Sequence, residues 1–407
     1  MSDRTVFTGI GVVAPTGLGT EAHWEAVLAG KSGLDRISRF DTDGYPVKVG
    51  GEVSDFAVGD HLSSRISVQT DHWTHMGLVA ADLALADAGV TPSEMDEYEL
   101  AVITASSSGG TEFGQREIER LWSKGSDHVG VYQSVAWFYA ATTGQISIRH
   151  GMRGPCGVVV SEQAGGLDAI AQARRALSET SQVVVTGGTD ASLCPYGLVA
   201  QMSSGLLSTV DDPLRAYLPF DRNANGHVPG EGGAILIAER GESAAARGAQ
   251  VYGELLGHAA TFDPVPGSGR PPALKRAIEK ALADARVAPQ DIDVVFADAA
   301  GRPDADLAES AALAAVFGPH GVSVTAPKTL TGRLYGGGSS LDVATALLAL
   351  RDGVIPPTVG VEDVDPRHRI DLVGDQPREL PLRRALVVAR GYGGFNAAVV
   401  LGAAQRR

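Results

Sequence analysis

The chain has few cysteines and no long apolar run. Two cysteines, Cys156 and Cys194, occur in 407 residues, which is too few for a disulfide framework and is typical of a reducing compartment. The sequence contains no run of about 18 apolar residues, so it predicts no membrane-spanning helix. The first residues lack the basic, apolar and small-residue order of a secretory signal. We therefore expect a protein of the cytoplasm.

Clusters of basic residues are also missing. Lys and Arg number 34 against 48 Asp and Glu, which gives a formal net charge of -14, and basic runs are no longer than pairs such as Arg174–Arg175. Binding to nucleic acid needs clustered positive charge, so this function is excluded. His72 and His75 have a spacing that could ligate a metal, but no third ligand follows at a recognised interval. We expect no metal site.

Short apolar, β-branched runs alternate with alanine-rich segments of helical period. This order predicts βαβ units with buried parallel strands, and therefore an α/β fold. In the first part we expect strands at 5–12, 100–104, 157–160 and 183–187, helices at 74–88 and 167–177, and a hairpin arm at 232–238. After residue 250 the order recurs, with strands at 251–256, 292–297, 322–325, 385–389 and 397–401 and helices at 272–285, 304–317 and 341–351. The recurrence predicts a duplicated fold with halves at 1–245 and 246–407.

The segment GVVVSEQAGGLDAIAQARRAL, residues 157–177, predicts a buried strand that turns tightly into a helix. A side chain at such a turn points into a pocket, beside the helix dipole and free backbone N–H groups, which suits a nucleophile. Gln163 occupies this position. An amide has no lone pair basic enough to attack a thioester, so covalent acyl transfer from this position is excluded. A polar helix cap is the alternative interpretation of Gln163.

This tight turn from strand to helix, here called the elbow, resembles that of the ketosynthase branch of the thiolase superfamily, where a cysteine precedes a Gly-Leu-Asp-Ala-like helix start. Residues 161–169, SEQAGGLDA, match this pattern with glutamine in place of cysteine. Glutamine preceded by Glu162 is similar to the chain length factor, the ketosynthase beta subunit of type II aromatic polyketide synthases. Residues 391–400 resemble the family's gate loop, with Tyr392 and Phe395 as its aromatic residues. The resemblance implies a thiolase fold with duplicated βαβαβαββ halves in five layers, α-β-α-β-α.

Two further segments resemble the loops that carry the family's catalytic histidines. In residues 294–310, Asp298 stands where the first histidine belongs. In residues 326–338, Lys328 is retained and Arg333 replaces the second histidine. We expect Asp298 and Arg333 to pair, because an unpaired buried charge is costly. The resemblance implies that no catalytic residue is intact and that the vestigial positions are Gln163, Asp298, Lys328 and Arg333.

A small-residue loop leads into a helix in residues 103–122. Thr111, Gly114 and Ile118 share one face of that helix and could project together toward a cavity. By resemblance these three residues and Phe138 limit the length of a product, and the small size of Thr111 and Gly114 predicts a deep tunnel and a long product. Packing of this face in the core is the alternative interpretation.

The resemblance implies binding in place of catalysis. The expected partner is a catalytic ketosynthase alpha subunit, in a heterodimer whose interface tunnel sets poly-β-ketone length during decarboxylative condensation of malonyl units. The aromatic segment 131–151 is expected at that interface. No cofactor is implied, since a separate acyl carrier protein, which binds transiently, carries the acyl groups on phosphopantetheine. A second hypothesis is a malonyl-carrier decarboxylase that primes synthesis through Gln163, but such domains keep both histidines.

Overall fold

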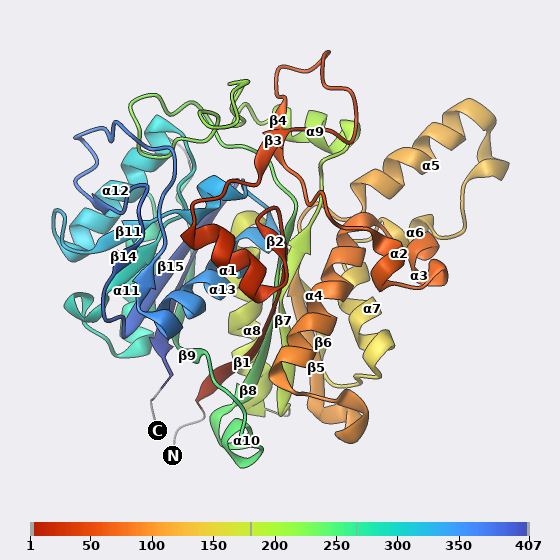
Figure 1. Ribbon diagram of the computed structural model, residues 1–407, viewed down its shortest axis with the longest axis horizontal. Helices are drawn as coiled ribbons and strands as arrows, with labels where there is room; N and C mark the ends of the chain where they lie inside the picture. The colour runs from red at the N-terminus through yellow and green to blue at the C-terminus, as the bar shows by residue number, and fades with distance from the viewer. Residues whose placement is uncertain (1–3, 180, 266, 405–407) are drawn as a thin grey trace.

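Two half-sheets with the same strand order form the centre of the fold (Figure 1). The computed structural model describes residues 4–179, 181–265 and 267–404. The first half-sheet has the order β6-β5-β7-β8-β1 and the second β11-β10-β15-β16-β9, and a short pairing of β1 with β9 joins them. The strands of the first are β1 (Thr5–Ala14), β5 (Leu100–Ala105), β6 (Cys156–Val159), β7 (Val183–Asp190) and β8 (Gly232–Arg240). Those of the second are β9 (Gly253–Phe262), β10 (Val294–Phe296), β11 (Ser323–Thr325), β15 (Arg384–Gly391) and β16 (Phe395–Ala403).

The two half-sheets also share their strand directions. In the first, β5 pairs parallel with β6 and β7, whereas β8 pairs antiparallel with β7 and β1. In the second, β10 pairs parallel with β11 and β15, whereas β16 pairs antiparallel with β15 and β9. The duplicated α/β fold is therefore confirmed. The division of the chain between residues 245 and 246 stays a prediction.

Helices form three layers around the half-sheets (Figure 1). The central layer consists of α8 (Gly165–Glu179) and α13 (Gly336–Asp352), which pack against strands of both halves. The outer layers are α4 (His72–Ala88) with α7 (Ala141–His150) on the first half and α11 (Leu274–Ala285) with α12 (Pro303–Phe317) on the second. This is the expected five-layer order. Because α13 is covered on all sides, nearly all of its residues are buried and apolar or small.

Glycine allows the layers to approach closely. A Cβ on Gly11 of β1 would lie 2.0 Å from the carbonyl oxygen of Ala80 in α4. A Cβ on Gly166 of α8 would lie 2.3 Å from the hydroxyl of Ser340 in α13. Side chains at these positions would push the helices off their neighbours.

The expected strands and helices are all present, with ends shifted by a few residues. The expected hairpin arm at 232–238 is instead an internal strand, because β8 pairs on one side with β1 and on the other with β7. Among the described helices, none has the length and apolar character needed to cross a membrane. The peripheral elements include β2 (Gly17–Leu18), β3 (Leu34–Arg36), β4 (Val49–Gly51), β12 (Val354–Ile355), β13 (Asp371–Leu372), β14 (Arg378–Glu379), α1 (Thr20–Leu28), α2 (Val58–His61), α3 (Ser64–Gln69), α5 (Thr111–Lys124), α6 (Gln133–Ala136), α9 (Pro195–Met202) and α10 (Gly241–Ala246).

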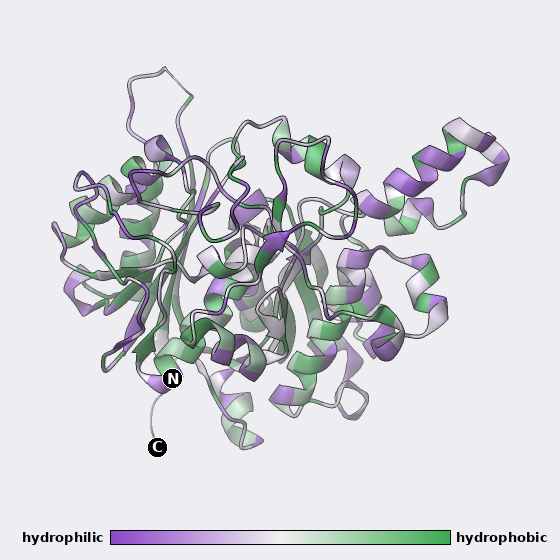
Figure 2. Cartoon of the chain, turned by 45° about the horizontal axis from the view of Figure 1, so that its top comes forward, coloured by the Kyte–Doolittle hydropathy of each residue, from purple (hydrophilic) through white to green (hydrophobic). Residues whose placement is uncertain are grey.

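One helix stands out from the body. Figure 1 shows α5 projecting from the side of the molecule that carries α4, α6 and α7. Its colours in Figure 2 are mainly hydrophilic, unlike the strands and the helices packed on them. Its Trp122 is nevertheless 83% exposed. An exposed tryptophan on a projecting helix is typical of a surface that a partner covers.

Candidate functional site

The elbow between β6 and α8 holds Gln163 at the centre of the fold. A short 3-10 turn, Glu162–Ala164, links the strand to the helix, and Glu162 has a left-handed φ of 53°. A residue with a Cβ is strained in this conformation. The turn directs Gln163 inward, where only 7% of the residue is exposed.

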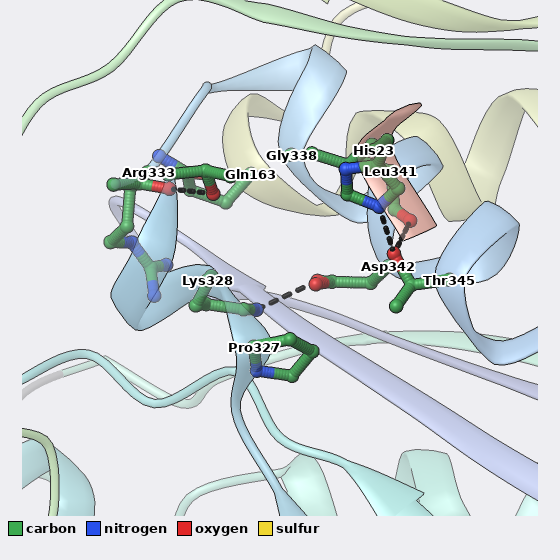
Figure 3. Close-up of a pocket in the computed structure, with 11 residues that line it drawn as sticks. His23, Gln163, Pro327, Lys328, Arg333, Gly338, Leu341, Asp342 and Thr345 are labelled. Carbon is green, nitrogen blue, oxygen red and sulfur yellow. Dashed lines mark hydrogen bonds and ion pairs between the residues drawn. The ribbon is translucent and has the colours of Figure 1, made fainter. Parts of the chain in front are cut away.

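The space around Gln163 is almost filled. Figure 3 shows the side chains around it, which line a cavity of about 10 Å³. That volume admits roughly one water molecule. The lining includes His23, Lys328, Thr331, Arg333, Gly338, Leu341, Asp342 and Thr345. An acyl chain has no room there, and the amide of Gln163 cannot act as a nucleophile.

The expected ion pair between Asp298 and Arg333 is present and buried. Nη2 of Arg333 lies 2.9 Å from Oδ1 of Asp298, and Nη1 donates to the carbonyl oxygen of Asp298 at 2.6 Å. Nη2 also donates to the carbonyl oxygen of Arg390 at 3.0 Å. Burial alone would raise the pKa of Asp298, but the charges of Arg333 and Lys328 hold it below its ordinary value. Both groups are therefore charged and satisfied.

The retained lysine is also neutralised. Nζ of Lys328 lies 2.7 Å from Oδ2 of Asp342 on α13, and the two side chains point toward each other in Figure 3. Burial raises the pKa of Asp342, an effect that Lys328 opposes. The amine therefore serves an internal contact instead of facing a substrate.

Two histidines near the site, the buried His23 and the partly buried His227, were not singled out from the sequence. His23 of α1 lines the small cavity, and its ring nitrogens contact the hydroxyls of Thr16 at 2.6 Å and Thr345 at 3.0 Å. Burial lowers the pKa of His23 to about 4 and that of His227 to about 3, so both rings are neutral. His23 lies in no motif, and its partners can be recognised only in three dimensions.

The gate loop closes over the other side of the elbow. Tyr392 is 66% exposed, and Phe395 packs edge-on against Phe262 with ring centroids 5.0 Å apart. The loop lines an outer pocket of about 280 Å³ together with Glu162, Arg333 and other residues. Arg333 thus borders both the outer pocket and the small cavity.

The expected length-limiting residues lie on and beside α5. The hydroxyl of Thr111 donates to the carbonyl oxygen of Ala191 at 3.3 Å, and Gly114 lies against the indole of Trp137. Ile118 is 45% exposed, as is Phe138. The alternative of core packing therefore does not hold for Ile118. The role of all four residues at a tunnel between subunits stays a prediction.

No thiol takes the place of the missing nucleophile among the residues that line the small cavity. Cys156 lies exposed in β6. Cys194 is the N-cap of α9, and its sulfur accepts the N–H of Gly197 at 3.4 Å. Burial raises the pKa of the Cys194 thiol, and partial desolvation of its sulfur raises that of Cys156 although the residue as a whole is exposed, which disfavours the reactive thiolate.

Comparison with known proteins defines the class. The sequence matches the N-terminal domain of beta-ketoacyl synthase over residues 2–244 and the C-terminal domain over residues 252–362. The chain therefore belongs to the beta-ketoacyl synthase family. Within that family, it belongs with the ketosynthase beta subunits, or chain length factors, of type II polyketide synthases.

Three relatives illustrate this position. The chain is 62% identical over 398 residues to the tetracenomycin polyketide synthase ketoacyl synthase beta subunit of Streptomyces glaucescens, covering 97% of each. It matches the structure of the ishigamide ketosynthase/chain length factor with a TM-score of 0.90 at 28% identity, covering 100% of both chains. It also matches a chain from a type II acyl-carrier protein in complex with its ketosynthase bound to the hexaketide, with a TM-score of 0.89 at 26% identity, covering 99% of this chain and 100% of that one.

We predict that Arg333→Met lowers the free energy of unfolding by about 3–5 kcal/mol, because it leaves the Asp298 carboxylate buried without a counter-charge. The double variant Asp298→Asn/Arg333→Met should lose less than Arg333→Met alone. Chemical denaturation measures both. In the control Lys275→Met, which removes an exposed pair with Glu279, the expected loss is about 0.5 kcal/mol. An equal loss of unfolding free energy in the single and the double variant would show that the Asp298 charge does not destabilise the protein when Arg333 is removed.

Proposed function

We propose that this chain is the non-catalytic subunit of a type II polyketide ketosynthase heterodimer and that it shapes the tunnel that sets poly-β-ketone length. The observation that carries the proposal is the nearly filled centre, where Gln163 lies at the position that the resemblance gives to a nucleophile and the buried Asp298–Arg333 pair lies at the positions that it gives to the histidines. The 62% identity to a ketoacyl synthase beta subunit supports it. Condensation then takes place on the partner's active site.

The free edge of the first half-sheet supports docking of a ketosynthase alpha subunit. In the second half-sheet, β13 pairs with the outer edge of β11, whereas among the described residues no strand covers the equivalent edge of β6. An uncovered strand edge is a template for pairing with another chain. Exposed apolar side chains lie on α5 and on the segments around α6, α7 and β6, among them Ile118, Trp122, Val131, Trp137, Phe138, Ile148 and Val160.

The same proposal assigns the substrate. Acyl groups arrive on the phosphopantetheine of an acyl carrier protein, which binds transiently, and the chain itself holds no cofactor. The growing poly-β-ketone extends from the partner into a tunnel limited by Thr111, Gly114, Ile118 and Phe138. The reaction takes place in the cytoplasm. Small side chains at 111 and 114 leave the tunnel deep, so the product belongs to the longer end of the family's range.

The decarboxylase hypothesis is weaker. The cavity beside Gln163 holds about 10 Å³, which is less than a malonyl group needs, and Arg333 is already engaged by Asp298. We predict that Gln163→Ala in the purified heterodimer leaves the rate of acetyl-carrier formation from malonyl carrier unchanged. Mass spectrometry of the carrier protein measures this rate. A loss of tenfold or more, about 1.4 kcal/mol, would restore the decarboxylase role.

Strand β6 offers a test of the heterodimer. The carbonyls of Pro155 and Val159 accept hydrogen bonds from the β5 side, so by alternation the N–H of Val158 faces the free edge. Val158→Pro removes that donor and should abolish co-purification with a ketosynthase alpha subunit. Val158→Ala keeps the N–H and should assemble normally. Normal recovery of the Val158→Pro complex would place the interface elsewhere.

Product length provides a second test. Thr111→Phe should shorten the dominant product of the reconstituted synthase, because the phenyl ring is larger than the threonine side chain and fills the end of the tunnel. Mass spectrometry of the products measures the change. Arg116→Phe, on the opposite face of α5 at 100° per residue, is the matched control and should leave the length unaltered. Unchanged products from an assembled Thr111→Phe heterodimer would remove Thr111 from the gate.

A further inference from the structure

One carboxylate joins the elbow to the gate loop. Oε2 of Glu162 accepts the backbone N–H of Gln163 at 2.8 Å and the backbone N–H of Tyr392 at 2.8 Å. The elbow follows β6 in the first half, and the loop lies between β15 and β16 in the second. A single side chain therefore holds together two segments that lie 230 residues apart.

The backbone on both sides is adapted to this contact. Glu162 keeps a left-handed φ of 53°, which favours glycine, although a carboxylate is present there instead. Gly391 approaches the elbow so closely that a Cβ would lie 2.6 Å from the carbonyl oxygen of Ser161 and 3.1 Å from Cβ of Glu162. The strain at one residue and the missing side chain at the other both serve the close approach of loop and elbow.

The contact lies on the boundary between two spaces. Gln163 lines the small inner cavity, Glu162 lines the outer pocket, and Arg333 lines both. Burial raises the pKa of the Glu162 carboxyl, and the Arg333 charge and the two N–H groups oppose this effect. Arg333 thus borders both spaces, and Glu162 borders the outer pocket directly beside Gln163 in the chain.

We propose that Glu162 is a positioning residue that clamps the loop 391–394 onto the elbow and seals the nearly filled centre from the outer pocket. The far side of the loop is fixed independently, because the N–H of Asp263 and the amide of Asn396 donate to the carbonyl oxygen of Gly394 at 2.8 Å and 3.0 Å. Loss of the Glu162 carboxylate therefore frees the Tyr392 side alone. The clamp is a property of this chain and does not depend on its role in polyketide synthesis.

Access to residue 163 tests the clamp. The reporter is the thiol introduced by Gln163→Cys in a Cys156→Ser background, and the readout is its rate of alkylation by iodoacetamide in the assembled protein, followed by peptide mass spectrometry. Glu162→Ala should raise this rate about tenfold or more, since the loop opens. Glu162→Gln removes the charge but keeps an oxygen that can accept both N–H groups, so it should stay within about threefold of the parent.

Hydrogen exchange of the peptide that contains Tyr392, measured with Gln163 in place, provides a second readout. In the Glu162→Ala variant, the amide hydrogens of this peptide should exchange faster. Gly391→Ala should have the same effect with Glu162 intact, because its methyl group pushes the loop off the elbow, and it substitutes for Glu162→Ala if that variant does not fold. Gly374→Ala, whose methyl group meets no neighbour, is the matched control.

Two results would overturn the clamp. One is an unchanged exchange rate of the Tyr392 peptide in both Glu162→Ala and Gly391→Ala. The other is equal acceleration of alkylation in Glu162→Gln and Glu162→Ala, which would show that the charge of Glu162 slows the thiol and that the loop is already open. Neither result would contradict the proposed heterodimer or its proposed role in setting product length.

Discussion

The buried ion pair of Asp298 and Arg333 fixes the arrangement of the centre. The guanidinium binds the carboxylate and carbonyl oxygen of Asp298 and the carbonyl oxygen of Arg390, so it joins the loop after β10, the loop before α13 and the end of β15. Such a pair is stable only while both members are present, because the survivor would be an uncompensated buried charge. The pair therefore constrains the loop after β10, the loop before α13 and the end of β15 to one arrangement.

A second buried carboxylate positions the loop that leads into the projecting helix α5. Asp190, at the end of β7, accepts hydrogen bonds from the Ser106 hydroxyl, from the N–H of Ser107 and from the N–H of Gly336 at the start of α13. Burial raises the pKa of Asp190 to about 6, and these donors oppose the shift. Because the loop that begins at Ser106 leads into α5, the central helix α13 and the helix α5 are positioned by the same group. The helix that carries Thr111, Gly114 and Ile118 is thus anchored on the buried centre of the fold.

The order of strands and helices could be predicted because its signals are local in the sequence, whereas contacts between distant segments could not. The patterns of buried strands and helices extend over only a few residues, so the order of elements and the duplication could be inferred from the sequence. The resemblance placed Asp298 and Arg333 at one site, and the cost of an unpaired buried charge then predicted that they pair. The contact of Glu162 with Tyr392 and that of His23 with Thr345 span most of the chain and leave no periodic signal. The exposure of Ile118 was equally hidden, because its helical face could be placed from spacing but the projection of α5 from the body could not.

More than one feature of the centre disfavours nucleophilic chemistry. An active centre must keep reactive groups unsatisfied and space empty, and both reduce stability. Here Lys328 and Arg333 are paired, and the space beside Gln163 admits about one water molecule. The nearby histidine His23 is held neutral by burial, so it could not stabilise a thiolate at residue 163 as a charged partner. Lys328 and Arg333 are held in ion pairs and His23 in hydrogen bonds. The surroundings of Gln163 therefore disfavour nucleophilic attack, as does its own amide.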